Sequence, residues 1–136
     1  MIVLDASVWV SIVLAGDVHR AISRQWARKW LGAGGRMVVP VLFLTEVAGA
    51  VSRQSGRAVR GRQASNTILT NSSFQLEVID RSLAESASRL AADLPLKGSD
   101  AIYVALAERL GVPLVTWDNE QLTRAAAVID VRTPTT

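Results

Sequence analysis

The sequence has no cysteine and a single histidine, His19, among its 136 residues. Without cysteine the protein cannot form a disulfide framework, a thiolate-bound zinc or iron–sulfur site, or a thiol nucleophile. One histidine excludes a metal site that is built from several imidazoles. Any bound metal must therefore be held by oxygen ligands, and such ligands favour Mg²⁺ or Mn²⁺.

Long apolar runs are also missing. The apolar stretches end well short of the ~20 residues that a membrane-spanning helix needs. No secretory leader pattern opens the chain, so we expect a cytoplasmic protein with no membrane partner. With 49% hydrophobic residues, a chain of this length is expected to fold as one ordered domain without disulfides or a structural metal.

Acidic residues are scarce in the first part of the chain. Residues 1–76 carry nine Arg or Lys against three acids, a charge of +6, whereas residues 77–136 carry six against nine, a charge of −3. Thirteen of the 15 basic residues are Arg, whose planar guanidinium fits phosphate oxygens. This asymmetry favours a polyanionic partner, although a solvated arginine-rich surface explains the composition equally well.

Short apolar runs alternate with helical patterns along the sequence. The runs predict strands at residues 1–4, 37–40, 76–79, 113–116 and 128–131. The patterns predict helices at residues 8–14, 18–31, 42–53, 82–94, 99–110 and 119–127. Residues 55–73 are polar, and Gly56 and Gly61 weaken their helical continuity.

This alternation predicts a single α/β domain over residues 1–132. We expect a three-layer α/β/α sandwich with a mainly parallel, about five-stranded sheet, followed by a short C-terminal tail at 133–136 that frays. Within the helix at 18–31, the four-residue spacing of Ile22, Trp26 and Trp30 predicts the buried face. His19 is expected at the surface and Trp117 in packing contacts.

Polar residues mark the expected helix starts. Ser7 is expected to open the first helix, and Ser82, with Glu85 three residues later, is typical of a capping box for the helix at 82–94. Asp80 is interpreted as a cap as well.

Four acidic residues stand where strands end or helices begin. Asp5 directly follows the first predicted strand, and Asp118 lies two residues past Thr116 after the fourth. Glu46 lies about one turn into the helix that leaves the second strand, and Asp100 lies in the first turn of the helix that precedes the fourth. Because functional groups gather at the carboxyl ends of strands in an open parallel sheet, we expect these four carboxylates to converge on one edge.

Each acid also has a purely structural interpretation. Asp5, Asp100 and Asp118 stand at helix starts, where a carboxylate accepts backbone N–H groups, and Gln121 follows Asp118 at capping-box spacing. Taken singly, capping and catalysis fit these three residues equally well. Glu46 is harder to explain as structural, because a lone carboxylate among apolar neighbours is costly without a partner.

The same acids carry a resemblance to the PIN domain family. Residues 5–8 (DASV), after a short apolar strand, resemble the opening motif of that family, and residues 45–47 (TEV) resemble its helix-borne glutamate motif. Residues 98–107 (GSDAIYVALA) are similar to its third acidic motif, and residues 111–118 (GVPLVTWD) to its last, a strand that ends in Thr-x-Asp. The four motifs follow the order and spacing of the family over nearly the whole chain.

In size and motif style the sequence resembles the VapC toxins of type II toxin–antitoxin modules. That resemblance implies a five-stranded parallel α/β/α sandwich, endonucleolytic cleavage of RNA with Mg²⁺ or Mn²⁺, a small cognate antitoxin and a homodimer. It implies that the metal and the catalysis belong to Asp5, Glu46, Asp100 and Asp118. Asn119 and Glu120 depart from the family pattern, which leaves open whether either joins the site.

Phosphodiester hydrolysis explains the need for clustered carboxylates. One divalent ion, or two about 4 Å apart, can activate a water and neutralise the charge that builds up on the phosphate, and hard ions need only carboxylate oxygens and water. Clustered carboxylates repel one another, so we expect raised pKa values without metal and a more stable fold with it. Ser7 and Thr116 are candidates to orient ligands or the attacking water, although ordinary cap and strand-end roles fit them too.

Two groups of arginines outside the acids are candidates to bind RNA or a partner. The first group has helical spacing and comprises Arg53, Arg57 and Arg60. The second lies opposite the tryptophan face of the helix at 18–31 and comprises Arg20, Arg24 and Arg28. In VapC-like proteins the early helices resemble the surface that an antitoxin covers, so either group could bind RNA or the antitoxin, and a solvated helix face is the alternative for both.

Other functions remain open at this point. A PIN-fold RNA- or partner-binding module without catalysis would keep the arginines and bind no divalent ion, whereas a housekeeping RNA-processing nuclease would share the chemistry without an antitoxin. A receiver-type phosphoryl-transfer protein also gathers Asp residues at strand ends. It is disfavoured because Asp5 has no acidic neighbour and the chain has only two lysines.

Overall fold

Five short strands form a sheet with the spatial order β3-β2-β1-β4-β5. The computed structural model of the protein describes residues 1–135. The strands are β1 (Ile2–Leu4), β2 (Met37–Pro40), β3 (Phe74–Glu77), β4 (Leu114–Val115) and β5 (Val131–Arg132). Every neighbouring pair is parallel, which confirms the predicted sheet.

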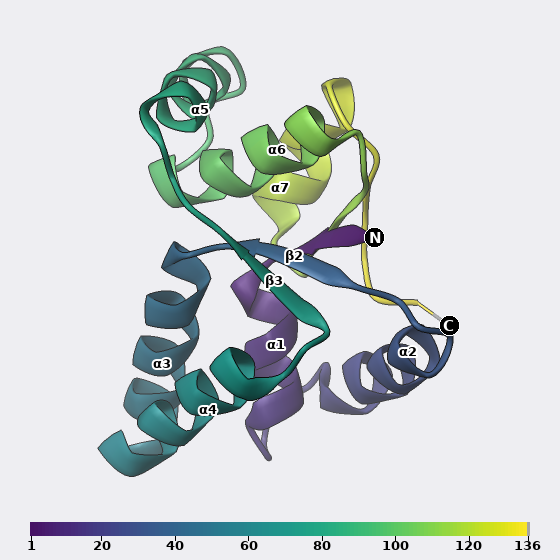
Figure 1. Cartoon of the computed structure of the whole chain (residues 1–136), viewed down its shortest axis with the longest axis vertical. Helices are drawn as coiled ribbons and strands as arrows, with labels where there is room; N and C mark the ends of the chain where they lie inside the picture. Colours follow the sequence, from purple (N-terminus) through teal and green to yellow (C-terminus); the bar gives the residue numbers. More distant parts are fainter. Residues whose placement is uncertain (136) are drawn as a thin grey trace.

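Helices cover both faces of this sheet, as crossover connections between parallel strands require. One side carries α1 (Ala6–Val13), α2 (Arg20–Gly32), α3 (Leu42–Ser55) and α4 (Ala58–Thr70), and the other carries α5 (Arg81–Asp93), α6 (Gly98–Leu110) and α7 (Asn119–Arg124) (Figure 1). A short 3₁₀ turn, Ala125–Ala127, follows α7. The expected α/β/α sandwich is confirmed. Within residues 1–135, no helix is long and apolar enough to cross a membrane.

The central strands are apolar because helices bury both of their faces. All residues of β1 and β2 are buried, with Val3, Leu4 and Met37 fully inaccessible. Trp9 on α1 packs edge-on against Phe74 of β3, with ring centroids 4.8 Å apart. The chain leaves β1 toward β2 on one side and later returns to place β4 on the other side, so the topological switch point lies between β1 and β4.

The largest difference from the sequence analysis lies in residues 55–73, most of which form the helix α4 (Ala58–Thr70). Gly56 has φ 70° and ends α3 in the left-handed conformation that glycine adopts without strain. Gly61 is buried, and a Cβ atom there would lie 2.6 Å from the carbonyl oxygen of Ala48. Gly61 therefore allows α4 to pack closely on α3, and the expectation that it weakens the helix was wrong.

Two carboxylates interpreted as helix caps are confirmed. Asp5 caps α1, and its Oδ2 accepts the backbone N–H of Ser7 at 3.0 Å. Asp80 caps α5 and accepts the backbone N–H of Leu83 at 2.8 Å, so the capping box expected at Ser82 and Glu85 was wrong. A carboxylate at a helix start accepts an N–H strongly and favours the positive end of the helix.

Two strand positions differ from their predicted ranges. The third strand begins two residues early because the sheet uses Phe74, which is buried, while Val78 is 68% exposed. The fifth strand begins late because the N–H of Val128 closes the 3₁₀ turn on the carbonyl of Ala125. Strand patterns alone could not distinguish these neighbouring apolar residues.

The second helix and the tail also depart from expectation. Ile22 is 47% exposed, and the buried face of α2 passes through Ser23, Trp26 and Ala27 instead. Pro134 is buried, so the expected fraying does not begin at residue 133. Position 136, also in the predicted tail, lies outside the described residues.

Candidate functional site

The carboxyl ends of β1 and β4 lie side by side and hold two of the predicted acids. Asp5 is the residue after β1, and Asp118 lies three residues beyond β4. The two strands are hydrogen-bonded neighbours, and the N–H of Asp5 donates to the carbonyl oxygen of Val115 at 3.0 Å. This is the switch point of the sheet, where open α/β folds bind their ligands.

Asp5 is almost fully buried, at 6% exposure, and its carboxylate meets several donors. Oδ2 lies 3.0 Å from the backbone N of Ser7 and 3.3 Å from Thr116 Oγ1. Oδ1 accepts from Gln121 Nε2 at 3.4 Å. Burial raises the pKa of Asp5 above its usual value, while these hydrogen bonds act in the opposite direction.

Asp118 caps α7, as its structural interpretation predicted. Its Oδ1 accepts the backbone N–H of Gln121 at 2.8 Å. The expected capping box is only half made, because the backbone N–H of Asp118 donates to Thr116 Oγ1 at 2.9 Å. The side chain of Gln121 is thus released from the cap and reaches Thr116 and Asp5.

Glu46 on α3 is partly buried, and its partner is Tyr103 of α6. The Tyr103 hydroxyl, which is fully buried, donates to Glu46 Oε1 at 2.6 Å. Burial raises the pKa of Glu46, and repulsion from Asp5 adds to the effect. The same burial and the two nearby carboxylates raise the pKa of Tyr103. Tyr103 is therefore the hydrogen-bond partner that compensates for placing the Glu46 carboxylate among apolar neighbours.

Asp100 lies in the first turn of α6 and completes the group of four. Burial, with repulsion from Asp118, Asp5 and Glu46 added to it, raises the pKa of Asp100 to about 6. The structure thus brings the other three predicted carboxylates within electrostatic range of Asp100. We call this group the carboxylate edge: Asp5, Glu46, Asp100 and Asp118.

The carboxylate edge supplies the donor type that Mg²⁺ and Mn²⁺ prefer, since it offers only hard oxygen atoms. Among residues 1–135, however, no three acidic or histidine side chains are grouped closely enough to hold an ion as they lie. Asp5, Glu46 and Asp118 each direct oxygens at donors of the protein itself. The donor chemistry of these side chains fits a hard divalent ion.

Ser7 and Thr116 adjoin Asp5, as the sequence analysis placed them. Their hydroxyl oxygens are 3.4 Å apart, and Ser7 Oγ accepts the backbone N–H of Trp117 at 3.1 Å. The Trp117 ring stacks on His19 with centroids 3.9 Å apart; His19 lies at the start of α2, and this stacking leaves it partly exposed. Glu120 forms an ion pair with Arg124 at 3.5 Å on α7.

The three arginines predicted to share one helix face are divided between two helices. Arg53 lies in the last turn of α3, Arg57 precedes α4, and Arg60 lies within α4. The interpretation as one continuous stripe was wrong because the α3–α4 turn interrupts it. Of the second group, Arg20 donates to the carbonyl oxygen of Ile12 at 3.3 Å, and Arg24 and Arg28 are exposed.

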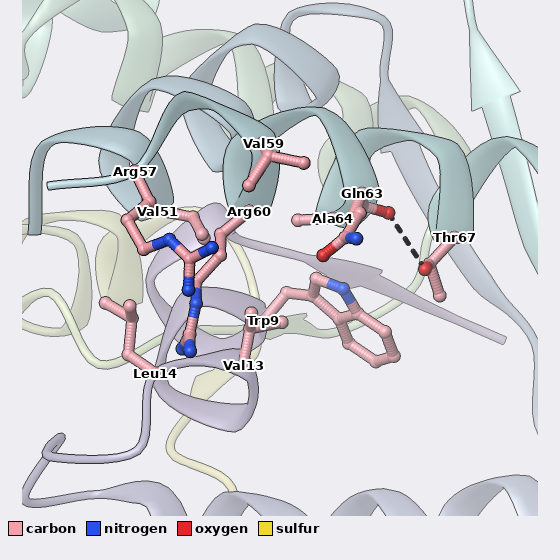
Figure 2. Close-up of a pocket in the computed structure, with 10 residues that line it drawn as sticks. All are labelled: Trp9, Val13, Leu14, Val51, Arg57, Val59, Arg60, Gln63, Ala64 and Thr67. Atoms are coloured by element: carbon pink, nitrogen blue, oxygen red, sulfur yellow. Dashed lines mark hydrogen bonds between the residues drawn. The ribbon is translucent and has the colours of Figure 1, made fainter. Parts of the chain in front are cut away.

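Arg57 and Arg60 line a groove between α1 and α4. The groove comprises two adjoining cavities of about 500 and 600 Å³ that share Leu14 and the two arginines. Both arginine side chains extend from the α4 side over α1 (Figure 2). The indole nitrogen of Trp9 points toward α4 in this groove and has no hydrogen-bond partner within the described part of the chain. We call this feature the arginine groove.

Comparison with known proteins places the chain by its sequence and by its fold. The family model described as PIN domain matches residues 2–128. A search of curated protein sequences finds no significant match.

Several solved structures share the fold at low sequence identity. VapC20 of Mycobacterium tuberculosis, a toxin that cleaves the sarcin–ricin loop, superimposes with a TM-score of 0.77 at 20% identity, covering 95% of this chain and 96% of that one. A toxin–antitoxin complex from Klebsiella pneumoniae gives 0.71 at 21% identity, and VapBC2 from Rickettsia felis, bound to a DNA fragment of its promoter, gives 0.72 at 14%. Each of these two matches covers 98% of both chains.

Proposed function

This chain belongs to the PIN domain family, and we propose that it is an endoribonuclease that hydrolyses RNA phosphodiester bonds with Mg²⁺, or with Mn²⁺ in its place. We further propose that it acts in the cytoplasm as the toxin of a toxin–antitoxin pair. The observation that carries the first proposal is that Asp5 and Asp118 follow β1 and β4 at the switch point of the sheet and that these two acids, with Glu46, raise the pKa of Asp100. The likeness to VapC structures supports the second.

In the proposed reaction a water attacks the phosphorus atom, one P–O bond breaks, and the leaving oxygen takes up a proton. A bound divalent ion would supply charge neutralisation and a more acidic water. The four carboxylates of the edge would hold that ion. The Ser7 and Thr116 hydroxyls would orient the Asp5 carboxylate, and Tyr103 would keep Oε1 of Glu46 in place.

RNA cleavage tests this proposal directly. We expect wild-type protein to cut RNA with Mg²⁺ or Mn²⁺ and to lose activity with EDTA. Asp5→Asn and Asp100→Asn should be inactive, whereas the matched control Asp93→Asn, at an exposed acid that ends α5, should keep wild-type activity. Equal activity in all four proteins would contradict the mechanism.

The main alternative is a binding module without catalysis, and Mn²⁺ binding distinguishes it from a nuclease. Such a module would have no need of Mn²⁺, so calorimetric titration with Mn²⁺ separates the two. We expect saturable binding by wild-type protein and weaker binding by Asp100→Asn. Binding of RNA without any uptake of Mn²⁺ would favour the module.

We propose that the arginine groove receives the antitoxin. Its floor is apolar, with Val13, Leu14 and Val51, and its rim carries the two guanidinium groups of Arg57 and Arg60. RNA phosphates need no apolar floor, whereas a peptide with apolar and acidic side chains would satisfy both parts.

Growth assays distinguish a toxin from a housekeeping nuclease. Expression of the chain alone should arrest bacterial growth, and co-expression of the small protein encoded beside it should restore growth. A housekeeping nuclease would cause no arrest that a neighbouring gene relieves. The family resemblance also implies a homodimer, which light scattering of the purified protein tests.

A further inference from the structure

Gln121 is a fully buried amide beside the carboxylate edge. Its side chain has no exposed surface, although it lies in the first turn of α7, three residues after the cap Asp118. Burying an amide costs free energy unless its donors and its acceptor are all bonded. If this position served only to fill space, Leu or Met would do so without any need for hydrogen-bond partners.

The Gln121 amide uses all of its hydrogen-bonding groups within the site. Oε1 accepts a hydrogen bond from the Thr116 hydroxyl at 2.6 Å, and the longer contact of that hydroxyl with Asp5 Oδ2, at 3.3 Å, shares the same hydrogen. Nε2 donates to Asp5 Oδ1 at 3.4 Å and to the carbonyl oxygen of Asp100 at 3.5 Å. The backbone N–H of Gln121 meanwhile donates to Asp118 Oδ1 at 2.8 Å. One residue therefore touches three of the four acidic residues.

These contacts join three separate segments: the end of β1, the end of β4 and the start of α6. The two oxygens of Asp5 are held differently, because Oδ2 faces Ser7 and Thr116 while Oδ1 faces Gln121. Rotation of the Asp5 carboxylate is thus limited by the amide. The bond to the Asp100 carbonyl also ties the first turn of α6 to Asp5.

We propose that Gln121 is a positioning residue for the metal site, one that sets the orientation of Asp5 and its separation from Asp100. The inference rests on the proposed function, because it concerns how the carboxylate edge binds its ion. Residues that hold metal ligands in place affect metal affinity or activity by about 10- to 100-fold in other proteins. The two long bonds from Nε2 leave room to shorten when the carboxylates close on an ion.

Two variants distinguish the effect of the amide's hydrogen bonds from the effect of the space that the side chain fills. Gln121→Met keeps a side chain of similar length and removes every polar group, whereas Gln121→Glu keeps an oxygen for Thr116 and removes the donor to Asp5. We expect both to bind Mn²⁺ about tenfold more weakly or worse in calorimetry. At saturating Mn²⁺ we expect a lower kcat for RNA with little change in KM, because the RNA contacts are untouched.

A metal-free readout and a core variant complete the test. In protein without metal, the ¹³C resonance of the Asp5 carboxyl should shift in both variants. Ile68→Val, a buried truncation on α4, should change neither that resonance nor Mn²⁺ affinity, even if it lowers the melting temperature. Assays are run below the melting temperature of every variant.

The outcomes are distinct. A wild-type protein that binds no Mn²⁺ and cuts no RNA overturns the proposed function and this inference together. An active wild type with a Gln121→Met variant of equal Mn²⁺ affinity and equal kcat overturns the inference alone, because the residue then serves packing only. Loss in both Gln121 variants with Ile68→Val unaffected supports the positioning role.

Discussion

The carboxylate edge and the arginine groove lie along the same helix, α1, yet they treat their polar groups in opposite ways. At the N-terminus of α1, Asp5 is surrounded by donors from Ser7, Thr116 and Gln121. One turn further along, the buried indole N–H of Trp9 has no hydrogen-bond partner among residues 1–135. The edge is therefore organised by hydrogen bonds within the chain and has excess negative charge, whereas the groove is lined by the positive charges of Arg57 and Arg60.

This contrast indicates what each region lacks. Under the proposed function, a cation would relieve the mutual repulsion at the edge. The groove places two guanidinium groups beside apolar side chains, for which a partner with acidic and apolar side chains is proposed. The two regions are therefore expected to respond to different ligands.

Loss of a carboxylate at the edge is expected to have the largest effect. Asp100→Asn should lower RNA cleavage by more than about 100-fold, because it removes a proposed metal ligand outright. Single-turnover cleavage of a labelled RNA measures the change. In the groove, Arg57→Glu should leave Mn²⁺ affinity at the wild-type value. A large loss of Mn²⁺ binding by the groove variant would show that the two regions are not separate.

Much of this arrangement could be predicted from the sequence, because the relevant signals are local. The apolar run before Asp5 and the strand before Asp118 define two strand ends, and parallel strands place such ends on one edge. The helix-start positions of Asp5 and Asp118 likewise correctly suggested caps. Capping turned out to be compatible with a place in the group of four acids.

The contacts that complete the edge could not be predicted, because they join distant residues. Tyr103 and Glu46 are 57 positions apart, and Gln121 and Asp5 are 116 apart. The one available signal was Gln121 at capping-box spacing, which indicated a bond to the backbone rather than to Asp5. The helix α4 was missed for a similar reason, since the value of Gly61 lies in its approach to Ala48 on α3.

Charge reversal of the groove should weaken antitoxin binding. We expect the pair Arg57→Glu and Arg60→Glu to lose about 2 kcal/mol or more of binding free energy, ~30-fold in Kd, because like charges would then face an acidic peptide. Titration calorimetry with the protein encoded beside this chain measures it. The same exchange at Arg24 and Arg28, which are exposed on α2, is the control. A larger loss in the control would move the partner surface to α2.

A smaller effect is expected when α4, which forms one side of the arginine groove, is pushed away from α3. Gly61→Ala places a Cβ atom against the Ala48 carbonyl oxygen and should lower the free energy of unfolding by about 1–3 kcal/mol. Gly32→Ala is the matched control, because no atom lies within 4 Å of the added carbon. Thermal unfolding measures both. Equal melting temperatures would mean that α3 and α4 are not in close contact at Gly61.

The smallest expected effect is on stability: without metal, Asp100→Asn should be slightly more stable than the wild type at pH 7. The Asp100 pKa is raised from 3.8 to about 6 in the folded, metal-free protein. Between these values the unfolded chain ionises first, so the penalty for burying the charge grows as pH rises through this window and is constant above it. Asp100→Asn removes the penalty, and we expect a gain of about 1 kcal/mol at pH 7, because Asp100 is partly exposed and its charge also favours the start of α6.

The same variant should lose its advantage in two conditions. Well below pH 3.8 the carboxyl is protonated in both states, so the melting temperatures of Asp100→Asn and wild type should converge as the pH falls toward that limit. With saturating Mn²⁺ at pH 7 the wild type should become the more stable protein, because only it keeps the full set of carboxylates for the ion. Asp93→Asn, at an exposed acid, should show neither the gain at pH 7 nor the reversal. If Asp100→Asn were less stable than wild type without metal at pH 7, the repulsion at the carboxylate edge would be too weak to demand a cation.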